Sequence, residues 1–404
     1  MGGACMTNTV AIIGANAAGL TTAMELRRLG YDGRVMLFDA EMEPLYNRPA
    51  VSKEMLSGEF SDPSDTPLVR ADILEKMHLE LEFGNRVLGI GTAGRLDLSG
   101  GRQVGAEVMV VATGGLARWP AQVPRLQGIH TLRTSRDAMA LREALLPGAR
   151  VVVMGGGVIG CEVASSAVRR GCDTTIVDIA ALPMLRSIGE GAGRVMATVI
   201  EEAGVKLRLG EGIASVLGPS RISGVVLMSG ETLPCDVLVI GVGMVPNAKL
   251  ANDAGAENDN GILIDAHCRT SLPGVLAVGD VTRRRSTVEG LGDRSETILN
   301  AQIQAREAAS TILGLELPKA QPSGFWSDQF DINIQAVGKV DRTVSHWLKP
   351  FNGQEGVLLQ FSENKLCGAV GFNSGRAIAR IRRLLSVGDR RPPEELLRDP
   401  KLNG

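Results

Sequence analysis

Two stretches of this chain are built alike, and they restrict its fold more than any other feature. In residues 9–39, an apolar run leads into Gly14-x-Asn16-x-x-Gly19, a helix-like stretch and a second apolar run. In residues 150–178, the same order surrounds Gly155-x-Gly157-x-x-Gly160. Each stretch predicts a strand, a Gly-rich turn, a helix and a second strand, which form a βαβ unit. The units begin about 140 residues apart, so the repeat indicates duplication of a whole domain.

The second Gly-rich turn has the full pattern of a dinucleotide site. Its glycines let the backbone approach a pyrophosphate at a helix N-terminus, where N–H groups and the helix dipole favour negative charge. Asp178 ends the following strand, 18 residues after Gly160, where a carboxylate can bind both ribose hydroxyls. This carboxylate would repel a 2′-phosphate, and no Arg follows at residues 179–182. We therefore expect NADH rather than NADPH here.

The first turn is less regular, because Asn16 stands where a glycine is usual. Asn tolerates positive φ, but its side chain takes room near a phosphate, so the turn alone leaves a structural role equally open. The following strand and the acidic residues Asp39 and Glu41 favour a second dinucleotide site. Two such sites in one chain imply electron transfer between two cofactors, for which FAD and a nicotinamide nucleotide are the usual pair.

Later segments extend this pattern and then depart from it. Apolar runs at residues 108–114, 236–243 and 274–280 each predict a strand that ends in small residues. Asp280 ends the last run, where it can cap a helix or bind flavin ribityl hydroxyls, and the two-site context favours the flavin. A helix is predicted at 296–313 and a linker at 319–324. Beyond it, short strand-like runs and a final helix predict a smaller α+β domain, at 332–338, 356–361, 366–371 and 376–387.

Composition excludes several function classes. The net charge of −2 disfavours nucleic-acid binding, and no apolar run reaches the ~18 residues of a membrane span. The six cysteines include no CxxC pair and the four histidines are scattered, so we expect neither a disulfide framework nor a metal site. The segment 1–6 lacks the basic and apolar regions of a signal peptide. We therefore expect a cytoplasmic protein without membrane contact.

Several further motifs are spread along nearly the whole chain. They are Tyr46-Asn-Arg48-Pro49-Ala-Val-Ser52-Lys53, Ala112-Thr-Gly114, Leu132-Arg133-Thr134, the segments 155–162, 241–247 and 277–280, Glu296 with Asn300, and 325–331. Together they resemble one family, the FAD-dependent ferredoxin reductases of bacterial oxygenase systems, such as putidaredoxin, rhodocoxin and rubredoxin reductases. The first motif is similar to the family's Y-x-R-P-P-L-S-K, and the strongest marker is the Phe-Trp-Ser-Asp-Gln segment that opens the third domain.

The resemblance implies an α/β, glutathione-reductase-like fold with two Rossmann-type dinucleotide-binding domains and a smaller α+β C-terminal domain. The FAD-binding domain would be discontinuous, formed by residues 7–115 and 245–322. Residues 116–244 would form the NADH-binding domain and residues 323–404 the C-terminal domain.

The resemblance also implies site residues. The FAD contacts would be Gly14, Ala15, Gly19, Glu41, Arg48, Lys53, Val87, Arg133, Asp280 and Ile298. The NADH contacts would be Gly157, Ile159, Glu162, Asp178 and Gly243. Lys53 would stabilise the anionic reduced flavin, with Glu162 as its partner, and both are predicted to be catalytic. For Lys53 the alternative is a solvated surface residue, and for Glu162 a carboxylate in the first turn of a helix.

Three positions depart from the family pattern. Asn16 replaces a glycine, Ala50 replaces the second proline, and Ile298-Leu299 stand where relatives often carry an aromatic residue and Gln. The last pair would line the approach of the nicotinamide, so its stacking is expected to differ. Trp326 can line the flavin edge or pack at a domain interface, and the sequence leaves both open.

The family's partner is an acidic 2Fe–2S ferredoxin, which supplies a cytochrome P450 or a ring-hydroxylating dioxygenase. A basic docking face is expected for it, and the candidates are Arg283, Arg284 and Arg285 and the segment 376–404, with eight Arg or Lys against four Asp or Glu. A solvated charged face is the alternative for both. We expect a monomer, because no dedicated dimer segment is evident.

Other functions occur on the same fold. Disulfide reductases need a Cys pair after the first βαβ unit, and NADH peroxidases and CoA-disulfide reductases need one Cys there. Ser52-Lys53 stand in that region, and no Cys lies between Cys5 and Cys161, which disfavours these classes. A flavin NADH oxidase that reduces O2, and a redox-responsive flavoprotein of the apoptosis-inducing-factor type, stay open. The sequence does not identify the ferredoxin, the oxygenase or the final organic substrate.

Overall fold

The chain divides into two compact units, each made of three segments. The computed structural model describes residues 8–43, 45–286, 290–292, 294–340, 344–389 and 391–403. Cys5 and the segment 1–6, read above for a signal peptide, lie outside this range. Unit 1 contains residues up to 48, 62–116 and 244–319, and unit 2 contains residues 49–61, 117–243 and 320–404. Each unit is described separately below.

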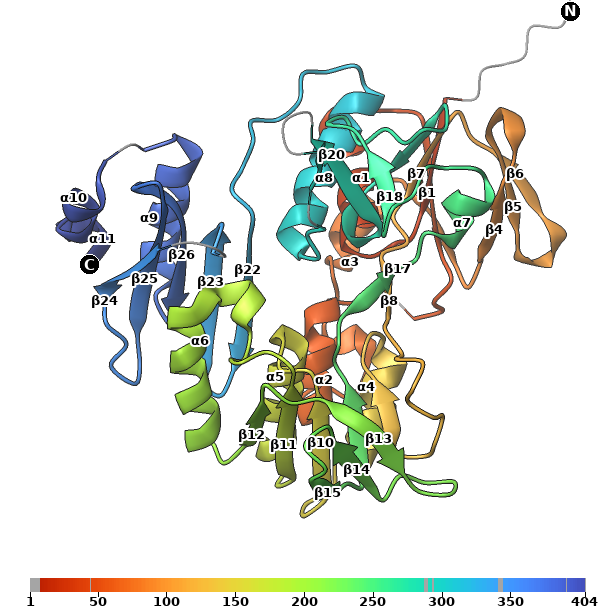
Figure 1. Cartoon of the computed structure of the whole chain (residues 1–404). Coiled ribbons are helices and arrows are strands. Elements are labelled where there is room, and N and C mark those ends of the chain that lie inside the picture. The colour runs from red at the N-terminus through yellow and green to blue at the C-terminus, as the bar shows by residue number, and fades with distance from the viewer. Residues whose placement is uncertain are drawn as a thin grey trace, which may run out of the picture. The chain divides into compact units, whose positions relative to one another are not determined.

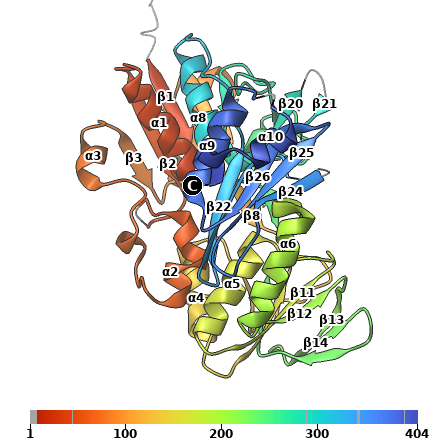
Figure 2. The same cartoon turned by 90° about the vertical axis from the view of Figure 1, so that its left-hand side faces the viewer.

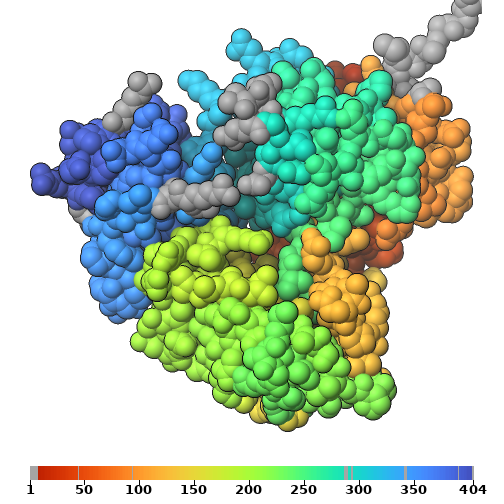
Figure 3. Space-filling view, viewed as in Figure 1, coloured from red at the N-terminus to blue at the C-terminus, as the bar shows by residue number. Residues whose placement is uncertain are grey.

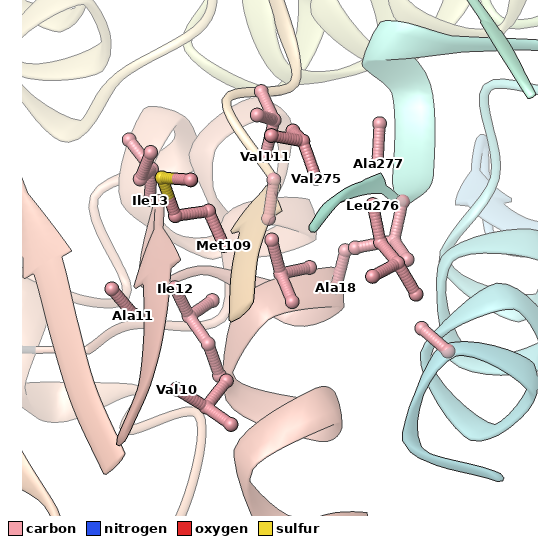
Figure 4. Close-up of a cluster of buried hydrophobic side chains, with 14 of the residues drawn as sticks. Val10, Ala11, Ile12, Ile13, Ala18, Met109, Val111, Val275, Leu276 and Ala277 are labelled. Atoms are coloured by element: carbon pink, nitrogen blue, oxygen red, sulfur yellow. The ribbon is translucent and has the colours of Figure 1, made fainter. Parts of the chain in front are cut away.

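Unit 1 is built on a parallel five-stranded sheet in which the first strand is central. Its strands, in spatial order, are β19 (Val275–Ala277), β7 (Val108–Val111), β1 (Thr9–Ile13), β2 (Arg34–Asp39) and β3 (Glu80–Phe83). All neighbours pair in parallel, with Ile12 beside Leu37 on one side and Val110 on the other. Every residue of β1 is buried, as continuous apolar runs predict for a sheet covered on both faces. Figure 4 shows the apolar side chains of β1, β7 and β19 gathered into this core.

Two long helices of unit 1 pack against each other, as Figure 1 shows. They are α1 (Ala17–Arg28) and α8 (Ile298–Ile312). Both begin with an N-cap: Asn16 accepts from the Ala17 N–H group, and Thr297 accepts from the Asn300 N–H group. The buried face of α8 is rich in alanine, at positions 301, 305, 308 and 309. Such small side chains allow close contact between helices. The predicted helix at 296–313 is confirmed.

Smaller elements complete unit 1. An antiparallel sheet joins β4 (Val87–Ile90), β5 (Arg95–Leu98) and β6 (Gln103–Gly105), and a second sheet joins β18 (Ile262–Ile264), β20 (Thr282–Ser286) and β21 (Gly290–Leu291). β17 (Met244–Pro246) pairs with β8 (Gly115–Ala117). The short helices are η2 (Pro63–Asp65), α3 (Ala71–Glu75), η3 (Thr92–Gly94), η4 (Ser99–Gly101), α7 (Lys249–Asp253) and η5 (Gly279–Val281), and η1 (Arg48–Ser52) begins at the last residue before the segment 49–61.

Unit 2 contains a second parallel five-stranded sheet. Its strands, in spatial order, are β12 (Lys206–Leu209), β11 (Asp173–Asp178), β10 (Arg150–Met154), β16 (Val237–Ile240) and β9 (Ile129–Thr131). An antiparallel sheet of β13 (Ile213–Leu217), β14 (Gly224–Leu227) and β15 (Thr232–Pro234) accompanies it. The helices around these sheets are α2 (Glu54–Ser57), α4 (Ser135–Ala144), α5 (Val158–Arg169) and α6 (Leu185–Glu202).

The last part of unit 2 is antiparallel, as the alternating sequence predicts. Its sheet has the order β22 (Gly324–Gln329), β23 (Ile332–Gly338), β26 (Lys365–Phe372), β25 (Gly356–Ser362) and β24 (Val344–Lys349). The helices α9 (Gly375–Ser386), α10 (Pro393–Leu397) and α11 (Pro400–Asn403) follow. The strands predicted at 332–338, 356–361 and 366–371 and the helix at 376–387 are confirmed.

The antiparallel sheet shares a hydrophobic core with the parallel sheet of unit 2. Buried Ile188 and Met196 of α6 belong to the same cluster as Leu358 of β25 and Phe372 of β26. Figure 2 shows α5 next to β22, and in Figure 3 the surface of α6 meets that of the C-terminal strands. One face of the antiparallel sheet is therefore packed against the second βαβ unit.

The α/β fold predicted from the two repeats is confirmed. The predicted boundaries of the three domains stay a prediction. Over the residues that the structure describes, every helix is too short or too polar to cross a bilayer.

Candidate active site

The first Gly-rich turn connects β1 to α1 in unit 1, and its geometry requires glycine at two places. Gly14 has φ +106°, and a Cβ there would lie 2.3 Å from the carbonyl oxygen of Ala112. A Cβ on Gly19 would lie 1.8 Å from the Gly14 oxygen, so this glycine lets the helix approach the strand. The Ala15 N–H group donates to Asp39 Oδ2 at 2.7 Å. Asp39 also accepts from the Glu41 N–H group, which ties the turn to the end of β2.

The second turn, between β10 and α5 in unit 2, repeats this geometry. Gly155 has φ +107°, and a Cβ on Gly160 would lie 1.9 Å from the Gly155 oxygen. Asp178 accepts from the Gly156 N–H group and, at 2.7 Å, from the Ala180 N–H group. Asp178 therefore holds the turn as well as standing where the sequence placed a ribose-binding carboxylate.

The two turns differ at their middle position, where each helix begins. Gly157 is the N-cap of α5, has no side-chain cap, and leaves the place of a Cβ without any atom within 4 Å. Asn16 is the N-cap of α1, and its Oδ1 accepts from the Ala17 N–H group at 2.8 Å. The second turn thus fits a pyrophosphate at its helix N-terminus. The first turn fits a pyrophosphate that has the amide side chain of Asn16 beside it.

The end of β2 leads into a cluster of three polar residues in unit 1. Arg48 Nη2 lies 2.7 Å from Glu41 Oε1, and the Tyr46 hydroxyl donates to Glu41 Oε2 at 2.8 Å. The Arg48 guanidinium lies 5.2 Å from the centroid of the Tyr46 ring. Burial lowers the pKa of Arg48, but the negative potential of Tyr46 and Glu41 outweighs it, so the pKa is raised overall. Glu41 and Arg48, two predicted FAD contacts, are thus neighbours.

Asp280 lies in η5, on a turn held by a buried glutamine that the sequence reasoning missed. Gln304 Oε1 accepts from the Gly279 N–H group at 2.6 Å and lies 3.0 Å from the Thr282 hydroxyl. Gln304 is 4% exposed, on the alanine-rich face of α8. A lone amide in a row of alanines was the available signal, because a buried polar group requires partners. Of the other predicted FAD contacts in unit 1, Val87 is the buried first residue of β4 and Ile298 begins α8 half-buried.

Three further predicted cofactor contacts lie in unit 2, near its Gly-rich turn or just before a helix. Ile159 is an exposed residue in the first turn of α5, and Gly243 has φ +89° shortly after β16. Arg133 directly precedes the capping box that Thr134 and Asp137 form at the start of α4, and its N–H group donates to Asp137 Oδ2.

Two exposed apolar residues next to Asp178 also escaped the sequence reasoning. Ile179 is 76% and Met228 75% exposed. A Cβ on Gly212 would lie 2.8 Å from Met228 Sδ and 3.5 Å from Ile179 Cγ2, so both flank this glycine. An apolar pair of this kind, beside the aspartate predicted to bind a ribose, can cover a flat aromatic base.

Lys53 and Glu162 meet within unit 2, although 109 positions separate them. Lys53 Nζ lies 3.6 Å from Glu162 Oε1 and 3.0 Å from Asp328 Oδ2. Glu162 is 4% exposed and accepts from the hydroxyls of Ser52 and Ser327. Burial raises the pKa of Glu162, although Lys53 and the two hydroxyls act in the opposite direction. The surface alternative for Lys53 does not hold, because its side chain is 11% exposed.

The three arginines of β20 are each matched by a carboxylate. Arg283 lies 3.1 Å from Asp259, and Arg284 and Arg285 pair closely with Glu307 and Glu257. These pairs offset the positive charge that the sequence offers as a docking face, so the docking role of β20 stays a prediction. Trp326, on β22, is 43% exposed.

Thiol and metal chemistry find little support. Cys161, Cys172, Cys235 and Cys268 are free and buried. Burial raises the pKa of the Cys161 thiol, which follows the second turn, far above its ordinary value. Among the residues that the structure describes, no group of three His, Cys, Asp or Glu side chains can hold a metal ion.

Comparison with known proteins extends these observations to the whole chain. Residues 8–305 match the family model described as pyridine nucleotide-disulphide oxidoreductase, and residues 324–403 match the model described as reductase C-terminal. The chain is 34% identical, over 396 residues, to the ferredoxin–NAD(+) reductase subunit of the benzene 1,2-dioxygenase system of Pseudomonas putida. That alignment covers 97% of this chain and 95% of the relative.

Solved structures show the same architecture. The ferredoxin reductase for the CYP199A2 system from Rhodopseudomonas palustris superimposes with a TM-score of 0.91 at 30% identity, covering 98% of each chain. The reductase in the covalent putidaredoxin reductase–putidaredoxin complex gives a TM-score of 0.90 at 28% identity, covering 97% of this chain and 96% of the other.

Proposed function

This chain belongs to the pyridine nucleotide-disulphide oxidoreductase family, and from that premise we propose that it is an NADH-dependent ferredoxin reductase containing FAD. The observation that carries the proposal is the pair of Gly-rich turns with matching geometry, each closed by an aspartate at the end of the next strand. One nucleotide site at each turn provides for a donor and a resident cofactor. When bound, FAD accepts a hydride from NADH and releases the electrons singly to a 2Fe–2S ferredoxin.

In this proposal the first turn and its neighbours hold FAD. Gly14, Ala15 and Gly19 bring the backbone and the α1 N-terminus to the pyrophosphate, and Glu41 binds the adenosine. Arg48 keeps Glu41 oriented through their 2.7 Å contact and offers positive charge to the phosphates. Asp280 accepts from ribityl hydroxyls, on the turn that Gln304 holds. Val87, Arg133 and Ile298 complete the predicted contacts.

The second turn holds NADH in the same way. Gly157 leaves room for the pyrophosphate at the N-terminus of α5. Asp178 accepts from the ribose hydroxyls, and the exposed Ile179 and Met228 cover the adenine. Ile159, Glu162 and Gly243 are the further predicted contacts. NADH is favoured over NADPH, because Asp178 would repel a 2′-phosphate and an isoleucine follows it.

Lys53 is proposed to supply the positive charge that stabilises negative charge developing on the flavin, with Glu162 as its partner. The 3.6 Å contact between their charged atoms supports this pairing. The disulphide chemistry in the family's name is not proposed for this chain. Ser52 and Lys53 stand where related classes need cysteine, and the buried Cys161 thiol has a raised pKa.

We propose an acidic ferredoxin as the partner, and α9 as the better supported of the two basic docking faces. This helix carries Arg376, Arg380, Arg382 and Arg383 and no acidic residue. Within the described residues, neither Arg376 nor Arg383 pairs with a carboxylate, whereas the arginines of β20 are all paired. A cytoplasmic location and a monomeric state stay predictions.

The decisive experiment is NADH-dependent reduction of cytochrome c by the purified protein, with and without an added 2Fe–2S ferredoxin. We expect reduction that requires the ferredoxin. Rapid NADH consumption without any response to several ferredoxins would instead show an oxidase. Slow reduction by NADH together with poor electron transfer would instead indicate a redox-responsive signalling flavoprotein.

A further inference from the structure

One face of α5 is a polar stripe in an otherwise apolar helix. Glu162, Ser165, Ser166 and Arg169 are spaced so that they share this face. Each has a partner from elsewhere in unit 2. Ser165 Oγ accepts from the Phe330 N–H group at 2.8 Å, and Ser166 Oγ donates to the backbone carbonyl oxygen of Ser52 at 3.0 Å. The Arg169 guanidinium lies 2.6 Å from the Asp331 carboxylate. The stripe therefore fastens both the Ser52-Lys53 segment and the β22–β23 hairpin to α5.

The centre of this arrangement is the carboxylate of Glu162. Ser52 donates to Oε2, and Ser327 donates to Oε1 at 2.5 Å. Ser327 Oγ in turn accepts from Gln329 Nε2 at 2.9 Å, which leaves its own proton for Glu162. The C-terminal residues 327 and 329 thus orient a hydrogen bond that stabilises the charged form of Glu162.

Asp328, next to Ser327 on β22, has the opposite relation to Glu162. Lys53 Nζ lies 3.0 Å from Asp328 Oδ2 but 3.6 Å from Glu162 Oε1, so two carboxylates share one ammonium group. Asp328 is held in place by Asn333 Nδ2, which donates to its Oδ1 at 2.6 Å. Asp328 is half exposed, whereas Glu162 is buried.

We propose that Ser327 and Asp328 are positioning residues with opposite effects on the protonation of Glu162: Ser327 favours its carboxylate form, and Asp328 favours its protonated form by drawing Lys53 away. This inference rests on the proposed function only where it places Lys53 and Glu162 next to the flavin. In this proposal, β22, the first strand of the C-terminal domain, controls the protonation of the buried Glu162 in the second βαβ unit.

The other elements around Glu162 contribute less to its electrostatic surroundings than Lys53 does. Among the described residues, Lys53 is the charged group with the largest effect on the pKa of Glu162. The other elements packed against α5 are α2, β10, β11 and α6. On β10, β11 and α6, Arg150 pairs with Asp236, Asp173 with Lys206 and Arg194 with Glu190, and Asp178 accepts backbone hydrogen bonds. The remaining charged residues of these elements are Glu54 of α2 and Arg186, Glu201 and Glu202 of α6.

The pKa directions agree with this assignment. Burial raises the pKa of Glu162. Burial also acts upward on Asp328, but the hydrogen bonds from Asn333 and Lys53 hold its pKa below the ordinary value. Of the two carboxyl groups beside Lys53, Glu162 has the raised pKa and Asp328 the lowered one.

The test is a pH titration of Glu162 by infrared spectroscopy, on the oxidised holoenzyme without NADH. The protonated-carboxyl band that disappears in Glu162→Gln identifies the group. We expect the midpoint of this band to fall by about one pH unit in Asp328→Asn and to rise by about one unit in Ser327→Ala, as the loss of one charge contact or one hydrogen bond predicts. Asp331→Asn is the matched control, because Asp331 lies on the same hairpin but pairs with Arg169. The midpoint of the Glu162 band should not move in this variant.

Shifts of the same sign in both variants, unchanged midpoints, or the absence of a band that depends on Glu162 would overturn the proposal. If Ser327→Ala does not fold, Ser52→Ala removes the other hydroxyl donor and should also raise the midpoint. The titration is independent of the proposed function. A protein that fails to reduce any ferredoxin would refute that function and leave these midpoints unaffected.

Discussion

Asp39 and Asp178 have the same structural role in the two repeated βαβ units. Asp39 accepts from the N–H groups of Ala15 and Glu41 at 2.7 and 2.9 Å, and Asp178 accepts from those of Gly156 and Ala180. Each carboxylate thereby fixes a Gly-rich turn to the strand that follows it. A carboxylate has about four acceptor positions, so two backbone bonds leave room for ribose hydroxyls.

Replacement of Asp178 is expected to impair NADH binding far more than FAD binding. Asp178→Ala removes the ribose acceptor and also loosens the turn, so the KM for NADH should rise about 10- to 100-fold, as the loss of charged hydrogen bonds predicts. Steady-state kinetics and the flavin content of the purified variant measure the two effects. Asp173→Ala, at the opposite end of β11, is the control. An unaltered KM would refute the ribose assignment.

Asn16 is expected to stabilise the protein as a helix cap. Asn16→Ala removes the acceptor of the Ala17 N–H group and should cost about 1 kcal/mol, whereas Asn16→Gly should cost only a few tenths of that. Thermal melting of the two variants tests this order. Equal losses would mean that the side chain does not act as a cap.

Removal of the Lys53 charge is expected to destabilise the protein in a pH-dependent way. The raised pKa of Glu162 means that its contribution to stability is complete below pH about 4.5 and declines as the pH rises through its folded value. Lys53→Met removes the ammonium and raises the pKa of Glu162 further. The melting temperature should therefore fall more at pH 8 than at pH 5.

The double variant Lys53→Met/Glu162→Gln provides the control for that experiment. It leaves no uncompensated buried charge, so most of the loss at pH 8 should be recovered. A loss that is the same at both pH values, or that the double variant does not relieve, would contradict the pairing of Lys53 with Glu162.

Reduction of the flavin is expected to slow when Lys53 is shortened. Lys53→Ala removes a positive charge proposed to stabilise the reduced flavin, and the rate should drop at least about tenfold. Anaerobic stopped-flow mixing with NADH measures this step directly. The control is Lys206→Ala, because Lys206 is a surface lysine of the same unit that pairs with Asp173. A rate equal to that of the wild type would remove Lys53 from the mechanism.

The docking face is expected to lie on α9. Arg376→Gln/Arg383→Gln should raise the KM for an acidic ferredoxin at low ionic strength, and the difference should vanish in high salt because surface charges are screened. Arg194→Gln is the neutral control, because the Arg194 side chain is exposed on α6 and pairs with Glu190. Arg283→Gln/Arg285→Gln provides the comparison for β20. A larger effect at β20 than at α9 would reverse the assignment.

The sequence alone was sufficient for the architecture. The two Gly-rich turns could be found without a structure, because positive φ at Gly14 and Gly155 and close helix packing at Gly19 and Gly160 leave glycine as the residue that fits. The antiparallel C-terminal strands followed from alternation of apolar and polar residues. Both signals are local, since they depend on neighbours a few positions apart along the chain.

The partners of the charged residues were decided by the tertiary structure. Glu162 receives a hydrogen bond from Ser327, 165 positions away, and shares Lys53 with Asp328. The arginines of β20 read as an open basic run in the sequence, yet each pairs with a carboxylate from a distant segment. Local patterns set backbone conformation, whereas the charge and protonation of a side chain depend on which distant groups the fold brings within a few ångströms of it.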